Sequence, residues 1–279
     1  MDIFIRTKRY TGPVQALVLD WAGTAVDYGC LGPMAVFLDV FAKYGVQVTL
    51  DEARAFMGLM KKDHIRSMCR TPSVMDKWEA AHGRVPNESD VEAMYQKTEP
   101  MMVGVIAKHA DLIPGLLEAV DAFKAMDIKI GTSTGYTGSM MDVLVPEAAK
   151  KGYSPDSVVC STDVPAGRPF PWMCYQNAIN LEVYPMEAMV KIGDTISDIQ
   201  EGRNAGMWTI GLTRSGNELG LPKAEADALD SADLAARLKG IEERYFEAGA
   251  HYVVEDISHC PQLMAEINHR LAQGELPLP

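Results

Sequence analysis

Carboxylates at two distant points of the chain could do chemistry together. Asp20 directly follows the apolar run at 16–19, and Asp194 directly follows a second strand-like run at 189–193. In open α/β sheets, ligands bind at the carboxyl ends of buried strands, where both side chains would lie. With Asp198 as a third carboxylate, these oxygens could hold Mg²⁺, which prefers oxygen ligands and keeps several waters. The alternatives are a loop or capping role for Asp20 and an ordinary helix-capping pair formed by Thr195 and Asp198.

Two other segments could bind the oxygens of a phosphoryl group. The run at 128–132 is followed by Ser-Thr-Gly-Tyr-Thr at 133–137, which offers hydroxyl and backbone N–H groups near the start of a helix. An ordinary capped turn is an equal interpretation of this segment on its own. Arg168 lies in the loop at 166–169 and can bind phosphate in bidentate fashion. Taken alone, it would be interpreted as a surface arginine.

A lysine and a histidine in the segment 57–64 could form a reactive pair. Lys61 stands among apolar residues, and on a helix Lys61 and His64 lie on the same face. Desolvation or a neighbouring cation would lower the pKa of the lysine and make its amine nucleophilic. Lowering that pKa from about 10.4 to about 7 costs roughly 4–5 kcal/mol, which is feasible only in a closed apolar cleft. The alternative is a solvated helix face, the usual environment of a lysine.

The elements that must position these side chains fall into two groups. Beyond residue 108, short strand-like runs alternate with helical patterns. We expect strands at 16–19, 128–132, 158–160, 189–193, 208–212 and 251–254. This alternation predicts an α/β fold whose core is a doubly wound, parallel, Rossmann-like sheet. Residues 32–108 contain no convincing strand, which predicts an inserted all-helical cap domain.

We assign residues 1–27 and 108–279 to the α/β core and residues 28–107 to the helical cap. The cleft between two such domains is where a small ligand would be closed away from water. The cap helices are expected at 32–45, after the capping pair Thr49 and Glu52, at 59–69, from Pro72, and from the capping pair Ser89 and Glu92 toward Lys108.

Composition and charge limit the classes of function that this chain can have. The chain has 279 residues, of which 47% are hydrophobic and 23% charged, as in ordinary globular proteins. No apolar run approaches the length of a membrane span, and no signal-peptide core is found near the start. The net charge of −12 argues against nucleic-acid or membrane partners and means that an anionic substrate needs local cations or a metal. Five widely spaced cysteines favour reduced thiols in a cytoplasm.

Together, the four strand-end segments resemble the haloacid dehalogenase superfamily, whose motifs occur in this order along the chain. The resemblance covers the whole core. It implies that Asp20 is the nucleophile toward phosphorus and that Thr134 supplies the hydroxyl of the second motif. It further implies that Arg168 is the cation of the third motif and that Asp194 and Asp198 are the carboxylates of the fourth.

One position departs from the common pattern of that superfamily. Most of its phosphatases carry a second Asp two residues after the nucleophile, as general acid for the leaving group, whereas this sequence has Ala22 there. A phosphate ester would then lose a contribution of about 10²–10⁴ in rate. A different group must activate the leaving group.

Longer stretches resemble the phosphonoacetaldehyde hydrolase (phosphonatase) family. They are Asp-Trp-Ala-Gly-Thr at 20–24, Val-Asp-Tyr-Gly-Cys at 26–30, the Lys61 segment, Gly-Arg-Pro-Phe-Pro-Trp-Met at 167–173, Gly-Asp-Thr at 193–195 and Glu-Gly-Arg-Asn-Ala-Gly-Met-Trp at 201–208. In that family the cap lysine forms a Schiff base with the substrate aldehyde, and Ala in place of the second Asp is characteristic. The resemblance therefore implies hydrolysis of phosphonoacetaldehyde to acetaldehyde and phosphate, in 2-aminoethylphosphonate degradation, through a Schiff base and an aspartyl phosphate.

The same resemblance suggests roles for the remaining candidates. Lys61 would form the Schiff base, and His64 would relay its protons. Mg²⁺ would be held by the Asp20 carboxylate, the Ala22 carbonyl and Asp194. The candidates for contact with substrate are Met57, Tyr136 and Cys30, although for Met57 and Cys30 apolar packing is the commoner role. A homodimer is expected because family members are typically dimers and the helix at 32–45 is apolar enough to pair.

Two other functions fit part of the pattern. A capped phosphatase or phosphomutase acting on a sugar phosphate would use Asp20, Thr134 and Asp194 equally well, but it leaves Ala22 and Lys61 without a role. A nonenzymatic phosphate-binding or interaction protein on the same fold is a third hypothesis, which the retained Asp20 disfavours.

Overall fold

The apolar run after Gln15 forms the central strand of a parallel sheet. The computed structural model describes residues 9–277, and in it β1 (Ala16–Leu19) lies fully buried between β2 (Lys129–Thr134) and β4 (Met189–Gly193). The sheet is completed by β3 (Ser157–Cys160), β5 (Trp208–Leu212) and β6 (Tyr252–Val254). Its order is β3-β2-β1-β4-β5-β6, with every neighbouring pair parallel. The predicted doubly wound sheet is confirmed, and its order reverses beside β1, where such sheets bind ligands.

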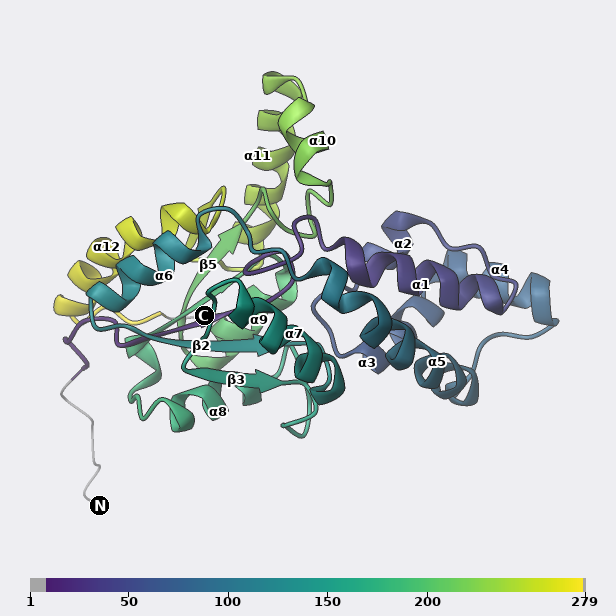
Figure 1. Ribbon diagram of the computed structural model, residues 1–279, viewed down its shortest axis with the longest axis horizontal. Helices are drawn as coiled ribbons and strands as arrows, with labels where there is room; N and C mark the ends of the chain where they lie inside the picture. Colours follow the sequence, from purple (N-terminus) through teal and green to yellow (C-terminus); the bar gives the residue numbers. More distant parts are fainter. Residues whose placement is uncertain (1–8, 278–279) are drawn as a thin grey trace, which may run out of the picture.

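Helices cover both faces of this sheet because successive side chains of a strand point to opposite faces. On β1, Leu17 and Leu19 belong to one hydrophobic core, and Ala16 and Val18 to another. The helices of this part are α6 (Leu116–Ala125), α7 (Gly138–Lys150), α8 (Trp172–Asn180), α9 (Ile196–Ala205), α10 (Lys223–Ala228), α11 (Ser231–Glu247) and α12 (Cys260–Ala272). Figure 1 shows α10 and α11 projecting from the rest as an arm.

Five helices lie between β1 and α6 in the sequence and pack on one another. They are α1 (Leu31–Lys43), α2 (Leu50–Arg54), α3 (Lys61–Cys69), α4 (Pro72–His82) and α5 (Glu88–Ile106). Phe37, Phe41, Ile65 and Trp78 are among their fully buried side chains. In Figure 1 the arrows of β2 and β3 point toward this helical group. The predicted helical cap is therefore present at the ligand-binding edge of the sheet, and the domain boundaries remain predictions.

One local prediction in the cap is wrong. The capping residue of α5 is Asn87, whose side chain accepts hydrogen bonds from the N–H groups of Ser89 and Asp90. Asp90 completes this capping box. The helix therefore starts at Glu88, and the expected capping pair Ser89 and Glu92 lies inside it. The face of α1 that carries Val36, Phe37, Val40 and Phe41 is buried within the cap, where α1 packs on α5, whereas Ala35 and Ala42 are exposed on its other face, so pairing of α1 with a second copy stays a prediction.

The described residues also bear on two expectations from composition. None of the helices within residues 9–277 has both the length and the apolar character needed to cross a bilayer. All five cysteines are buried free thiols, as the widely spaced pattern predicted. The cellular location stays a prediction.

Candidate active site

A small cavity lies where the carboxyl ends of β1 and β2 meet the cap. Its volume is about 20 Å³, which has room for about one water molecule. Eight residues proposed from the sequence line it, namely Asp20, Ala22, Cys30, Met57, Lys61, Thr134, Tyr136 and Arg168. His64, Asp194 and Asp198 are outside this lining, although both carboxylates lie close to Asp20. The structure therefore brings residues from cap and core together in a closed arrangement.

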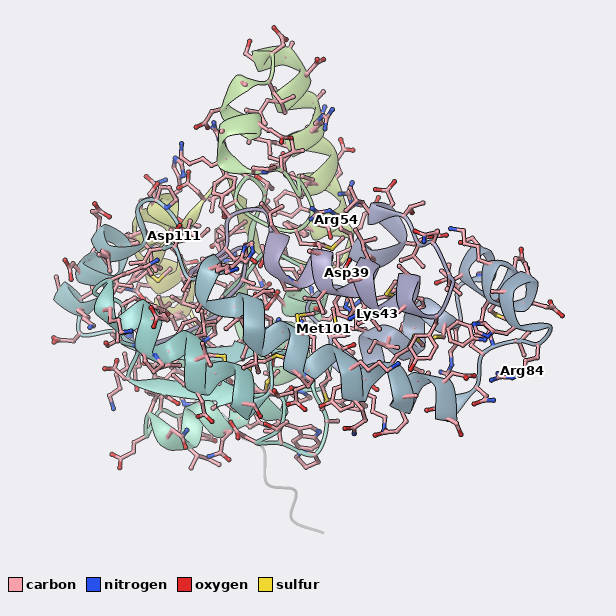
Figure 2. The ribbon with its side chains drawn as sticks, turned by 45° about the vertical axis from the view of Figure 1, so that its right-hand side comes forward. Asp39, Lys43, Arg54, Arg84, Met101 and Asp111 are labelled. Atoms are coloured by element: carbon pink, nitrogen blue, oxygen red, sulfur yellow. The ribbon has the colours of Figure 1, made fainter. Side chains whose placement is uncertain are left out.

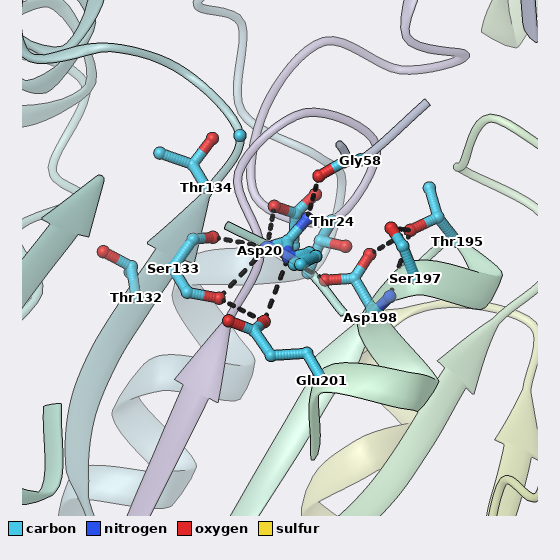
Figure 3. A network of polar contacts seen from close by, with 12 residues as sticks. Asp20, Thr24, Gly58, Thr132, Ser133, Thr134, Thr195, Ser197, Asp198 and Glu201 are labelled. Atoms are coloured by element: carbon cyan, nitrogen blue, oxygen red, sulfur yellow. Dashed lines mark hydrogen bonds and ion pairs between the residues drawn. The ribbon is translucent and has the colours of Figure 1, made fainter. Parts of the chain in front are cut away.

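Arg168 is fully buried and donates a hydrogen bond to Asp20. Its Nη2 lies 2.7 Å from Asp20 Oδ1 and 2.7 Å from the Ser133 carbonyl, and its Nε lies 3.0 Å from Glu201 Oε2. Figure 3 shows Asp20, Ser133 and Glu201 converging in this network of polar contacts. Burial raises the pKa of Asp20, and the charge of Arg168 opposes that effect. The interpretation of Arg168 as a surface arginine is therefore wrong, and the guanidinium holds the Asp20 carboxylate in place.

A second buried cation lies behind Asp20. Lys191 Nζ lies 2.6 Å from Asp198 Oδ1 and 3.5 Å from Glu201 Oε2, and all three side chains are fully buried. Burial would raise the pKa of Asp198, but the charges of Arg168 and Lys191 outweigh it and hold this pKa below its ordinary value. Asp198 also accepts a hydrogen bond from the Thr195 hydroxyl, and Thr195 caps α9. Asp198 thus combines the expected capping role with a buried ion pair.

Asp194 is buried and forms no ion pair with a cation among residues 9–277. Its oxygens accept hydrogen bonds from the Thr24 hydroxyl at 3.0 Å and the Asn217 N–H at 2.8 Å, and the Cys30 thiol lies 3.4 Å away. Burial and the charge of Asp20 raise the pKa of Asp194 well above its ordinary value. Such an environment calls for additional positive charge at this carboxylate.

The acidic cluster fits a hard cation. One oxygen each from Asp20, Asp194 and Asp198 lies within 4.8 Å of the others. Arg168 and Lys191 form ion pairs with Asp20 and Asp198, whereas Asp194 has no such pair in the described part of the chain. Carboxylate oxygens are the donors that Mg²⁺ prefers, so the residues present suit Mg²⁺ near Asp20 and Asp194.

Lys61 begins α3 and is buried, with 3% of its surface exposed. Its Nζ lies 4.6 Å from the ring centre of Tyr136 and 5.8 Å from that of Phe37. Burial lowers the pKa of Lys61 to about 8, and the negative charge of Asp20 limits the shift. The solvated helix face considered for this lysine is wrong, and its amine is buried between cap and core beside two aromatic rings.

His64 is fully buried behind Lys61 and neutral. Its ring stacks on Phe37 with ring centres 3.8 Å apart, and its Nε2 lies 2.8 Å from the Ala53 carbonyl. Because a carbonyl only accepts, Nε2 carries the proton, and Nδ1 has no partner among the described residues. Burial and the charge of Lys61 hold the pKa of His64 well below its ordinary value.

The cap loop at 57–60 approaches the core closely through glycines. Gly58 has a positive φ of 87°, and a Cβ there would overlap the Ser197 hydroxyl. A Cβ at Gly135 would overlap the Leu59 carbonyl. The carbonyl of Met57 lies 3.4 Å from the Ser197 hydroxyl, which donates to it. This close approach places the cap loop against the core beside the cavity.

Thr134 and Tyr136 come from the end of β2 and the loop after it. The Thr134 hydroxyl accepts a hydrogen bond of 3.2 Å from the Tyr136 N–H and also lines the cavity. The capped turn and the ligand-facing hydroxyl are thus compatible at this residue. Burial raises the pKa values of Tyr136 and Cys30 well above their ordinary values, which keeps both neutral.

The sequence interpretation did not identify four residues of this site. They are Thr24, Lys191, Glu201 and Asn217. Lys191 had a signal, because a lysine within a strand buried on both faces needs an acidic partner. Asn217 contacts Asp194 through its backbone N–H, which no side-chain pattern could indicate.

Comparison with known proteins gives concordant results. The sequence model of the family described as haloacid dehalogenase-like hydrolase matches residues 32–212. The chain is 60% identical over 277 residues to a phosphonoacetaldehyde hydrolase of Syntrophobacter fumaroxidans, covering 99% of this chain and 100% of that one. It is 54% identical over 279 residues to one of Nitratidesulfovibrio vulgaris, covering 100% of both chains.

A solved structure agrees with these relatives. It is a phosphonoacetaldehyde hydrolase-like protein from Oleispira antarctica, with a TM-score of 0.95 and 39% identity. The match covers 99% of this chain and 100% of the other. The similarity therefore extends over the cap as well as the core.

Proposed function

This chain belongs to the phosphonoacetaldehyde hydrolase family of haloacid dehalogenase-like hydrolases, and from this premise we propose that it hydrolyses the C–P bond of phosphonoacetaldehyde. The products are acetaldehyde and phosphate. The chain is accordingly an enzyme of the hydrolase class.

One observation carries the proposal. A buried lysine with a pKa of about 8 and a buried carboxylate line the same cavity, Lys61 from the cap and Asp20 from the core. Ala22 stands where a leaving-group acid would be expected. A phosphate ester has no use for the amine and lacks its acid here, whereas an aldehyde with a C–P bond uses the amine and needs no such acid.

Lys61 makes the carbon a competent leaving group. Its neutral amine attacks the aldehyde carbon, and loss of water gives a protonated Schiff base. When the C–P bond breaks, its electron pair moves into this iminium and forms an enamine rather than a bare carbanion. Protonation of the enamine at carbon and hydrolysis of the resulting iminium release acetaldehyde and restore the amine.

Asp20 receives the phosphoryl group. Its carboxylate attacks phosphorus as the C–P bond breaks, and water then hydrolyses the aspartyl phosphate to phosphate and free Asp20. Arg168 and Thr134 bind the phosphoryl oxygens, and the guanidinium already lies 2.7 Å from the Asp20 oxygen. Positioning and charge stabilisation are the main demands of phosphoryl transfer.

Mg²⁺ would supply charge neutralisation between the nucleophile and the phosphoryl group when bound. The residues that would hold it are the Asp20 carboxylate, the Ala22 carbonyl and Asp194. Asp198 supports this arrangement through Arg168 and Lys191, with which it forms buried ion pairs.

His64 accepts and returns the protons of Schiff-base formation, for which its unpartnered Nδ1 is in the required neutral form. Because His64 does not line the cavity, water carries the proton between His64 and the Lys61 amine. Met57, Tyr136 and Cys30 contact the substrate. A cavity of about 20 Å³ is too small for substrate, so the cap opens for binding.

Phosphate release from phosphonoacetaldehyde, measured with and without Mg²⁺, tests the function. A panel of phosphate monoesters, including sugar phosphates, is the comparison. Fast turnover of monoesters with none of phosphonoacetaldehyde would favour a sugar-phosphate enzyme instead. No phosphate release from any substrate would favour a binding protein.

The wider setting follows from the substrate. We place the reaction in 2-aminoethylphosphonate degradation, in the cytoplasm, where the five buried thiols stay reduced. We propose a homodimer, and the exposed apolar side chains around α8 supply a candidate contact in addition to α1. They are Phe170, Trp172, Ile179 and Tyr184. Sedimentation of an Ile179→Asp variant tests that contact, since a monomer is expected.

A further inference from the structure

We propose that Arg54 is a positioning residue that couples closure of the cap to the orientation of Asp194, an inference that rests on the function proposed above. Arg54 is the last residue of α2, in the cap. Figure 2 shows it at the junction between the cap helices and the segment that leads to α10 and α11. It has no part in the mechanism described so far.

The guanidinium of Arg54 joins α2 to the start of the cap at Gly29 and to the core loop at 213–220. Nη1 donates to the carbonyls of Gly29 at 3.1 Å and Asn217 at 3.2 Å, and Nη2 donates to the carbonyl of Gly220 at 2.7 Å. In return, the Asn217 side-chain amide donates to the Arg54 carbonyl at 3.3 Å. Gly220 has a φ of 65°, and a Cβ there would overlap the guanidinium. The loop at 213–220 is therefore shaped around this side chain.

The same loop fixes the Asp194 carboxylate. The Asn217 N–H donates to Asp194 Oδ2 at 2.8 Å, and a Cβ at Gly216 would overlap the Asp194 side chain. Ser215 binds the turn after Asp20, because its hydroxyl donates to the Gly23 carbonyl at 2.7 Å. One residue, Asn217, thus contacts Arg54 through its side chain and Asp194 through its backbone.

The acceptors of these hydrogen bonds indicate that Arg54 holds peptide segments together and does not pair with a carboxylate of the described residues. All the hydrogen bonds that the guanidinium donates within residues 9–277 go to amide oxygens. A planar guanidinium can donate to Gly29, Asn217 and Gly220 at once only when the turn at Gly29 and the loop at 213–220 are both correctly placed around it. The contacts therefore form together when the cap is closed and are lost together when it opens.

Closure in this way would assemble both halves of the site. Arg54 is seven residues before Lys61, and the intervening segment contains the cap loop that touches Ser197 through Met57. The movement that brings the Lys61 amine toward Asp20 also brings Arg54 onto the loop that orients Asp194. The carboxylate is then fixed for Mg²⁺ only when the amine is in place.

Metal titration of the complete chain tests the proposal. Isothermal titration calorimetry with MgCl₂, without substrate, is carried out on the wild type, Arg54→Met and Arg54→Lys. Outer groups that orient metal ligands contribute roughly 10–100-fold in affinity, and we expect the lower end, about tenfold, for Arg54→Met. Arg54→Lys should lie between the two because one ammonium reaches fewer of the carbonyls.

Arg203 provides a matched control. It also donates to the carbonyl of a glycine with positive φ, Gly249, at 2.6 Å, and a Cβ at Gly249 would overlap it. Arg203→Met should leave the Mg²⁺ affinity unchanged. Phosphate release by Arg54→Met should recover at high Mg²⁺ concentration, which a general loss of structure would not allow.

The possible outcomes are distinct. An unchanged Mg²⁺ affinity in both Arg54 variants overturns the proposal, and so does an equal loss in Arg54→Met and Arg203→Met. If Arg54→Met is unfolded by circular dichroism, Arg54→Lys decides the matter alone. If the affinity falls as expected but the wild type releases no phosphate from phosphonoacetaldehyde, the positioning role stands and the proposed function fails.

Discussion

The amine of Lys61, from the cap, lies 4.6 Å from the ring centre of Tyr136, from the core. An aromatic face favours the protonated amine, whereas burial disfavours it. Burial prevails, and the pKa of Lys61 falls to about 8. The pKa of the amine therefore lies close to neutral pH at the point where cap and core meet, so a usable fraction of the amine is uncharged.

Replacement of Lys61 should abolish the reaction with the fold intact. Lys61→Ala is expected to lower phosphate release by roughly 10³-fold or more, a loss of about 4 kcal/mol in transition-state stabilisation. Lys61→Arg, which keeps the charge but cannot form an iminium, should be equally inactive. Borohydride added with substrate should label Lys61 in the wild type, as mass spectrometry of peptides would show. A fully active Lys61→Ala enzyme refutes the mechanism.

The rate of this labelling should depend on pH near 8. The neutral amine reacts, and with a pKa of about 8 its fraction rises from about one tenth at pH 7 to about nine tenths at pH 9. Labelling rates between pH 6 and 10 measure this directly. A midpoint near the ordinary lysine value would show that the amine is not desolvated in solution.

Removal of the metal should lower stability as well as activity. Because burial and Asp20 raise the pKa of Asp194, its charged form destabilises the metal-free protein at neutral pH. Mg²⁺ at 100 times its dissociation constant should stabilise the wild type by about 2.7 kcal/mol. Asp194→Asn should not respond to Mg²⁺ and, without metal, should unfold at a higher temperature than the wild type. That advantage should shrink as pH falls through the raised pKa of Asp194.

The buried ion cluster should be essential for folding stability. Lys191→Met leaves the fully buried carboxylates of Asp198 and Glu201 without their lysine, and breaking such a pair costs about 3–5 kcal/mol. Urea unfolding measures this loss. Lys150→Met is the control, since Lys150 pairs with Glu147 on the surface and its loss should cost about 1 kcal/mol or less.

The linkers between cap and core carry a pH-dependent contact. His109 Nδ1 lies 3.1 Å from Asp27 Oδ1, and this hydrogen bond raises the pKa of His109. A raised pKa in the folded state stabilises the fold below the unfolded value, and the stabilisation disappears as pH rises through the folded value. Wild type and His109→Gln should therefore differ in unfolding free energy at pH 5.5 and converge above pH 8. A constant difference would contradict this linkage.

The sequence predicted the sheet and the residues at its edge for a simple physical reason. Short apolar runs define buried strands, and the carboxyl ends of parallel strands must lie together, so Asp20, Thr134 and Asp194 could be placed from their positions alone. Local capping was less certain. Asn87 directly precedes α5, and its side-chain oxygen accepts from the N–H groups of Ser89 and Asp90, so Ser89 already lies inside the helix.

Tertiary structure alone decided how the buried charges are matched. Arg168 with Asp20, and Asn217 with both Arg54 and Asp194, join positions that are far apart in the sequence, and no local periodicity records such pairs. The pKa of Lys61 likewise depends on how deeply the cap and core bury it together. Sequence determined which groups stand at the strand ends, and packing between cap and core determined their charge, because desolvation exists only once the elements have closed around them.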